Sequence, residues 1–273
     1  MKLVECFLYD GEHEAVGIRF QEHRSDIDEY WVIESDQTFT GFPKPLKFHS
    51  DAAKYGWDLS RVKVWDISSE RKPSKDPWVH EYSSRDFVYY LSDDLRDCDL
   101  LLVSDADEIA SNRAIQQIKE LGSRSLPIRL GLHTSYLFLD YQLVEPQWVA
   151  NCSWAYVISR QHLRYATASQ WRLELQAGTF HGLLMPNSGW HFSYLGGVER
   201  IRKKLESFSH TEFSKEYIPI DLDVSQLVRK GADLLRRPGY RFDLVDLGML
   251  PDCVIDDLGR FEHLLFHRSQ ERQ

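Results

Sequence analysis

The stretch LLVSDADEIA, Leu101 to Ala110, decides the fold class. Its apolar half belongs to the run Leu100–Ser104, in which apolar and polar residues do not alternate. A short run of this kind predicts a strand covered on both faces, as in parallel sheets. The run ends in the carboxylates of Asp105, Asp107 and Glu108. The sequence therefore predicts a buried strand whose carboxyl end carries a cluster of acids.

The first half of the chain alternates strands and helices around this stretch. Such alternation predicts a mainly parallel, Rossmann-like sheet that is flanked by helices and joined by right-handed crossovers. The fold class is therefore α/β. The other expected strands are Leu3–Tyr9, Tyr30–Glu34 and Val62–Ile67, and the expected helices are Glu14–Arg24, Trp78–Leu95 and Ser111–Leu121, the last capped by Ser111 or Asn112.

The second half of the chain is less regular. It predicts strands over Ile128–Tyr136 and Ala155–Ile158, and a helix over Val198–Phe208 with one apolar face. Prolines and glycines break up the C-terminal region. With 273 residues, the chain suits a single large domain.

Charge and composition exclude several classes of protein. A net charge of −9 argues against a nucleic-acid or anionic-membrane surface, because either would require a basic face. The four cysteines form no CxxC pair, so reduced thiols are expected. No apolar run approaches the roughly 20 residues that span a bilayer, and the N-terminus lacks a signal-peptide pattern. We expect a cytoplasmic protein without a transmembrane segment or a nucleic-acid partner.

The acidic cluster has two interpretations on local grounds. Ligands of open α/β sheets lie outside the carboxyl ends of the strands. If the chain stays extended, Asp105 and Asp107 point the same way and can converge on one Mg²⁺ or Mn²⁺ ion. Alternatively, the acids form a solvated turn and are favoured by the N-terminus of the next helix. The local pattern leaves both open.

Three longer segments carry a resemblance to a known family. They are WVIESDQTFTGFPKPLKF (Trp31–Phe48), DLLLVSDADEI (Asp99–Ile109) and SGWHFSYLGGVERIRKKLESFSH (Ser188–His210). In this order they resemble glycosyltransferase family 17, over roughly Leu3 to Glu212. The resemblance implies a GT-A fold, with a nucleotide-sugar half over residues 1–125 and an acceptor half with the C-terminal region over 126–273.

The resemblance also implies an activity. It is an inverting, metal-dependent transfer of a sugar, above all GlcNAc from UDP-GlcNAc, to a glycan hydroxyl. We expect no membrane anchor of the kind that the eukaryotic enzyme of the family carries. We therefore expect a cytoplasmic enzyme, peripheral at most at the inner face of a membrane. Its acceptor would be a growing polysaccharide or a lipid-linked oligosaccharide.

The resemblance assigns metal ligands. Asp107 would bind Mn²⁺ or Mg²⁺ directly, while Asp105 would contact the ribose, or the metal through water. His191 in GWHFS would complete the shell, with His210 as the second candidate, although a lone histidine is more often a hydrogen-bonded core residue. Trp190 would stack on a sugar ring or pack under the site.

The donor-binding residues have local alternatives. Glu34 would accept a hydrogen bond from ribose or uracil, or would be a turn carboxylate. Arg85 would bind the diphosphate, or would form a salt bridge with Glu81. Glu108 would bind the donor sugar, or would cap the next helix.

The catalytic base is the least determined role. An inverting transfer needs one group to deprotonate the acceptor. Glu199 is the first candidate, although the helix dipole and a pair with Lys203 also explain it. Glu174 is the second candidate, followed by Asp140 and Glu212.

Two other classes remain as alternatives. A metal-dependent nucleotidyltransferase also uses paired aspartates, but LYDGEHEAVG after the first strand is not a Gly-rich phosphate loop. A non-catalytic carbohydrate-binding protein would use the abundant aromatic residues and would not respond to nucleotide.

Overall fold

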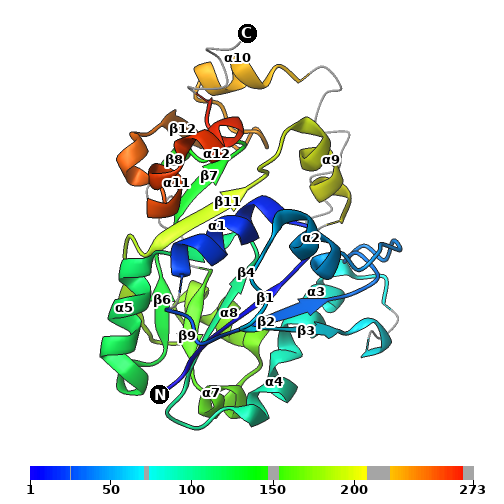
Figure 1. Ribbon diagram of the computed structural model, residues 1–273, viewed down its shortest axis with the longest axis vertical. Coiled ribbons are helices and arrows are strands. Elements are labelled where there is room, and N and C mark those ends of the chain that lie inside the picture. Colours follow the sequence, from blue (N-terminus) through cyan, green and yellow to red (C-terminus); the bar gives the residue numbers. More distant parts are fainter. Residues whose placement is uncertain (25, 71–73, 147–153, 208–221, 267–273) are drawn as a thin grey trace.

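The fold was analysed in a computed structural model of the chain (Figure 1). It describes residues 1–273 except 25, 71–73, 147–153, 208–221 and 267–273. The chain forms two sheets with helices around them. The predicted class, α/β with a Rossmann-like sheet flanked by helices, is confirmed.

The larger sheet has seven strands in the order β10-β6-β9-β4-β1-β2-β3. The strands β1 to β4 run parallel, and only β9 is antiparallel to its neighbours. Their carboxyl ends therefore meet at one edge. The strands are β1 (Leu3–Leu8), β2 (Glu29–Glu34), β3 (Val62–Asp66), β4 (Leu100–Asp105), β6 (Ile128–Leu130), β9 (Tyr156–Ile158) and β10 (Leu183–Met185).

Both faces of this sheet are buried, as the unbroken apolar run of β4 predicts. Leu100 and Leu102 point into one core cluster, while Leu101 and Val103 point into another. The first face is covered by α1 (His13–His23), α2 (Phe48–Tyr55) and α5 (Asn112–Leu121), and the second by α3 (Pro77–Asp86), α4 (Val88–Leu91), α7 (Arg160–Tyr165) and α8 (Ala168–Ala177).

The smaller sheet was not anticipated from the sequence. Its five strands follow the order β12-β8-β7-β11-β5. They are β5 (Glu108–Ala110), β7 (His133–Tyr136), β8 (Tyr141–Glu145), β11 (Gly189–Ser193) and β12 (Arg241–Leu244), and the helices nearby are α9 (Val198–Ser207), α10 (Val224–Arg229), α11 (Asp252–Asp256) and α12 (Leu258–Phe261).

The two sheets join at the acidic cluster. The strand β4 ends at Asp105 and β5 begins at Glu108, with a turn of Ala106 and Asp107 between them. The chain thus passes from the larger sheet into the smaller one within the quoted stretch.

Two predicted elements are divided in the structure. The helix expected over Trp78–Leu95 breaks at Phe87 into α3, α4 and a short 3₁₀ segment, where aromatic and β-branched residues have low helix propensity. The strand expected over Ile128–Tyr136 splits into β6 and β7, which belong to different sheets. Of the two proposed caps, Ser111 is the N-cap of α5, because its Oγ accepts a hydrogen bond from Ala114 N at 3.2 Å.

The proposed halves do not coincide with the sheets. The strands β6, β9 and β10 follow residue 125 in sequence but belong to the same sheet as β1 to β4. The division into a donor half and an acceptor half therefore stays a prediction. Within the described residues, none of the helices combines the length and hydropathy that crossing a membrane requires.

Candidate active site

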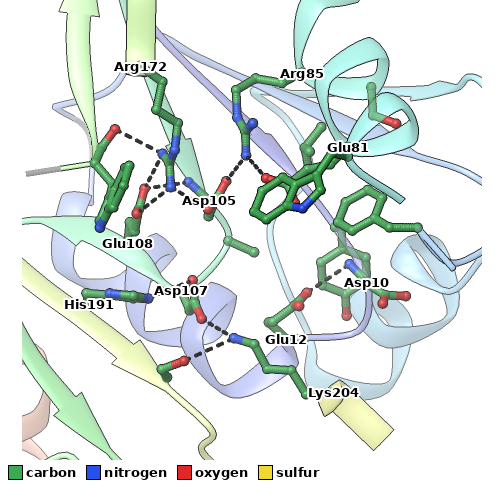
Figure 2. Close-up of a pocket in the computed structure, with 18 of the residues that line it drawn as sticks. Asp10, Glu12, Glu81, Arg85, Asp105, Asp107, Glu108, Arg172, His191 and Lys204 are labelled. Atoms are coloured by element: carbon green, nitrogen blue, oxygen red, sulfur yellow. Dashed lines mark hydrogen bonds and ion pairs between the residues drawn. The ribbon is translucent and has the colours of Figure 1, made fainter. Parts of the chain in front are cut away.

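A cavity of about 810 Å³ lies at the carboxyl ends of β1, β2 and β4. Its volume falls within the range of roughly 300–1,000 Å³ that is typical of small-molecule sites. The wall includes the predicted site residues Arg85, Asp105, Asp107 and Glu108, which Figure 2 labels, and also Glu34. The edge where the parallel strands end has therefore brought most of the candidates together.

The acidic turn does not have the extended conformation in which its two aspartates would converge. The turn at Ala106 and Asp107 sends Asp105 and Asp107 to different partners. The buried Arg19 of α1 supports this turn, since its Nη2 donates hydrogen bonds to the carbonyl oxygens of Asp105 at 2.7 Å and of Glu108 at 2.8 Å. The condition for both carboxylates to point the same way, an extended chain, is therefore not met.

Asp105 is held by two arginines. Its Oδ1 lies 3.0 Å from Arg85 Nη2, and its Oδ2 lies 2.6 Å from Arg172 Nη2. Burial alone would raise the pKa of Asp105, but Arg172 and Arg85 hold it below its ordinary value. Asp105 is therefore an ionised partner of two guanidinium groups.

Glu108 belongs to the same network. Arg172 donates to both of its carboxylate oxygens, at 2.8 and 3.0 Å, and Glu108 Oε2 also accepts the Asp105 N–H at 2.9 Å. The alternative in which Glu108 caps the next helix is wrong, because the residue lies in β5 and Ser111 makes the cap. With only 1% of Glu108 exposed, these contacts order the turn. Its role toward a donor sugar stays a prediction.

Asp107 points to the other side of the turn, as Figure 2 shows. Its Oδ2 accepts a hydrogen bond from Lys204 Nζ of α9 at 2.5 Å, and its Oδ1 lies 3.6 Å from His191 Nε2 of β11. Burial opposes ionisation of Asp107, but Lys204 and His191 hold its pKa well below the ordinary value. Asp107 therefore carries a full negative charge inside the cavity.

Strand pairing fixes the position of His191. The strand β11 is antiparallel to β5, and His191 stands opposite Glu108. The strands approach closely at Gly189, where an added Cβ would lie 2.0 Å from the Ile109 carbonyl oxygen. Only glycine fits there, so the register that brings His191 to Asp107 depends on it.

The described residues supply two adjacent donors for a metal ion. They are the Asp107 carboxylate and the His191 imidazole, whose facing atoms are 3.6 Å apart. No group of three His, Cys, Asp or Glu side chains suited to a metal occurs in the described part of the chain. Two donors fit Mg²⁺ or Mn²⁺, which commonly take water or substrate phosphate as the remaining ligands. His210 lies outside the described residues.

Glu34 and Arg85 make the contacts that their local alternatives predicted. Glu34 Oε1 accepts hydrogen bonds from Lys47 N at 2.5 Å and Phe48 N at 3.2 Å, at the start of α2. Burial raises the pKa of Glu34, although these N–H groups oppose the shift. Arg85 bonds Glu81 at 2.9 Å in addition to Asp105. Both Glu34 and Arg85 line the cavity, so donor roles stay predictions.

Trp190 packs beneath the site and is not part of the cavity wall. Its Nε1 donates to the carbonyl oxygen of Met249 at 2.7 Å, and its ring stacks on Phe192 in a core cluster. Only 8% of Trp190 is exposed. Of its two proposed roles, the structure shows packing, and a sugar ring in the cavity would not contact it.

The described candidates for the catalytic base lie outside the cavity. Glu199 is exposed on α9 and Glu174 is half-buried on α8, and neither lines the cavity. Asp140 is buried, with its Oδ1 accepting the Phe266 N–H at 2.9 Å. Glu212 lies outside the described residues. The geometry gives no support for a base at Glu199, Glu174 or Asp140.

A match to a family model identifies the family of this chain. The model of glycosyltransferase family 17 matches residues 1–247. The chain belongs to glycosyltransferase family 17. Membership favours the glycosyltransferase interpretation over both a nucleotidyltransferase and a carbohydrate-binding module.

Mammalian N-acetylglucosaminyltransferases are among the proteins similar to this chain. The human β-1,4-mannosyl-glycoprotein 4-β-N-acetylglucosaminyltransferase is 25% identical over 300 residues, covering 99% of this chain and 56% of its own length. The rat enzyme of the same name is 25% identical over 238 residues, covering 78% and 44%. The chain thus spans about half the length of the curated relatives that it matches.

Among solved structures, residues 1–349 of S. aureus TarS in complex with UDP-GlcNAc show a distant likeness. The identity is 10% and the TM-score is 0.45, with 86% of this chain and 70% of that chain covered.

Several residues of this family 17 site were missed from the sequence. Lys204 lies inside the GWHFS-to-helix segment, but lysines on an amphipathic helix usually face solvent. Arg172 is 64 residues from Glu108 and belongs to no motif. Arg19 sits in an ordinary helix. Glu12 follows the first strand, and this position beyond a strand end was the one sequence feature that could have indicated a site residue.

Proposed function

We propose that this chain transfers GlcNAc from UDP-GlcNAc to a glycan hydroxyl with inversion at the sugar. The observation that carries the proposal is the acidic turn Asp105–Glu108 inside an 810 Å³ cavity of a family 17 chain. The human relative's name gives the same sugar and a β-1,4-mannosyl acceptor.

The cavity offers partners for each part of such a donor. The β2 end and the following loop, with Ser35 and Thr38, would hold the nucleoside. Lys204 and Arg85 provide positive charge for the diphosphate. The aromatic rings of Trp78, Tyr82 and Trp154 also line the cavity and provide apolar faces for sugar rings, the role that Trp190 does not fill.

The proposed cofactor is Mg²⁺ or Mn²⁺, held by Asp107 and His191. Such an ion would neutralise the charge that develops on the departing diphosphate. Lys204 shares this task, because burial disfavours its charge but Asp107 and Glu12 raise its pKa and keep it cationic. Asp105 would then act on the donor indirectly, because its ion pairs hold Arg85 and Arg172 in position at the cavity wall.

The proposed acceptor is a glycan or a lipid-linked oligosaccharide in polysaccharide synthesis. The test of the donor comes first and does not require the acceptor. UDP release from UDP-GlcNAc, UDP-glucose and UDP-galactose is measured with and without Mn²⁺, using water and p-nitrophenyl β-mannoside as acceptors. We expect Mn²⁺-dependent release from UDP-GlcNAc.

Ligand binding provides a second measurement. UDP with Mn²⁺ should raise the melting temperature, because a ligand selective for the folded state stabilises it. A chain that neither releases UDP nor shifts its melting temperature with any nucleoside diphosphate would contradict the proposal.

A further inference from the structure

Glu12 occupies the junction of two cavities. It follows β1 and directly precedes α1. It lines both the main cavity and an adjoining cavity of about 300 Å³, and Asp107 and Lys204 line both as well. Figure 2 shows the Glu12 carboxylate beside the main-chain nitrogen of Asp10, in the same pocket as Lys204. A group at this junction can contact a donor in the larger cavity and an acceptor entering from the smaller one.

The other carboxylates of the main cavity are already engaged. Each described one forms an ion pair with a cation or accepts hydrogen bonds from main-chain N–H groups at a helix start. The pairs are Asp10 with Lys44, Glu34 with the N–H groups of Lys47 and Phe48, Glu81 with Arg85, Asp105 with Arg85 and Arg172, Asp107 with Lys204, and Glu108 with Arg172. A carboxylate held by a cation is a poor proton acceptor, because the cation stabilises its ionised form.

Glu12 differs from the cation-paired carboxylates of this set, and unlike Glu34 it also lines the smaller cavity. Its Oε2 accepts the Asp10 N–H at 2.8 Å, and within the described chain no lysine, arginine or histidine forms an ion pair with it. Burial and the nearby charge of Asp10 raise the pKa of Glu12, although Lys204 opposes the shift. A raised pKa makes its carboxylate a stronger base than an ordinary glutamate.

We infer that Glu12 is the catalytic base that takes the proton from the acceptor hydroxyl. The inference rests on the proposed inverting transfer. The acceptor oxygen forms a bond to C1 of the donor sugar while the C1–O bond to the diphosphate breaks. The hydroxyl proton moves to a carboxylate oxygen of Glu12, and the electron pair of the broken bond leaves with UDP. Glu12 then returns the proton to solvent.

The first test compares Glu12→Gln with the parent chain. The amide keeps an oxygen that can accept the Asp10 N–H but cannot take a proton. UDP binding by calorimetry should be retained, while UDP release in the presence of p-nitrophenyl β-mannoside should fall by about 10²–10⁴-fold. The matched control is Glu120→Gln, an exposed glutamate on α5 outside both cavities, which should keep full activity.

The second test separates a base from a residue that only shapes the site. Azide needs no deprotonation, so sodium azide should restore UDP release in Glu12→Ala and yield a glycosyl azide of inverted configuration. A purely structural role would not be rescued in this way.

The outcomes distinguish a failure of this inference from a failure of the proposed function. An active Glu12→Gln variant beside an active parent overturns the inference alone. So does loss of activity that azide does not restore while UDP still binds. A parent chain that neither binds UDP nor releases it from UDP-GlcNAc overturns the proposed function, and this inference with it.

Discussion

The guanidinium group of Arg19 donates a hydrogen bond of 2.8 Å to the main-chain carbonyl of Glu108. Arg19 is fully buried and forms an ion pair with Glu5, whose other carboxylate oxygen lies 3.1 Å from His23 Nδ1. The acidic turn is therefore supported from below by a charge network that never contacts solvent. Helix α1 contributes the arginine and the histidine, and β1 contributes the glutamate.

Replacing Arg19 by methionine should destabilise the fold. The change leaves the Glu5 carboxylate without its arginine and should cost about 3–5 kcal/mol of unfolding free energy. Urea denaturation measures this cost. The control Arg113→Met removes an exposed arginine of α5 and should stay within about 0.5 kcal/mol of the parent. Equal stabilities for both variants would contradict the role assigned to Arg19.

The two aspartates should respond differently to neutralisation. Asp105→Asn removes a charge that two buried arginines share, so we expect a loss of about 1.5–3 kcal/mol in unfolding free energy. Asp107→Asn should instead abolish the Mn²⁺-dependent rise in melting temperature with UDP, because it alters the donor beside His191. If Asp105→Asn lost the Mn²⁺ response and Asp107→Asn kept it, the metal assignment would be reversed.

Trp190→Phe should change stability and leave substrate affinity intact. The variant loses the hydrogen bond to Met249 O, worth about 1 kcal/mol, while an aromatic ring still packs near Phe192. The KM for UDP-GlcNAc should match that of the parent. A raised KM at unchanged stability would instead favour sugar stacking.

Asp99 should contribute stability that depends on pH. Its carboxylate accepts hydrogen bonds from Arg96 and from Lys2 N at the start of β1, and Arg96 above all lowers the pKa of Asp99. A carboxyl whose pKa is depressed by folding stabilises above its unfolded pKa, and this stability is lost as the pH falls toward the folded value. Asp99→Asn should therefore lower the melting temperature at neutral pH.

The same comparison at acidic pH completes this test. Below both pKa values the parent carboxyl is protonated, so the melting temperatures of Asp99→Asn and the parent should converge. A difference that stayed constant over the whole pH range would exclude the electrostatic explanation.

The sequence predicted those elements that depend on residues close together along the chain. The apolar runs in β2 and β4 and the mostly apolar β1 located the parallel sheet, and the end of β4 located Asp105 and Asp107. The smaller sheet was missed because strands as short as Glu108–Ala110 show no measurable periodicity.

The partners of the acids could not be predicted in the same way. Arg172 reaches Glu108 only because α8 packs on the sheet next to α3, and Lys204 reaches Asp107 only because α9 follows β11. Both contacts depend on tertiary packing, which the spacing of residues along the sequence does not reveal. The resemblance supplied the family, while the first candidate base, Glu199, was chosen from its place at the start of a predicted helix and proved to be an exposed helix residue.

The two-residue connection between β4 and β5 has a consequence for stability. A substrate bound at this turn contacts both sheets at once, so its binding energy is shared between two packing units. Substrate should therefore stabilise both sheets together, so that calorimetry shows the unfolding of both at a higher temperature when donor is added.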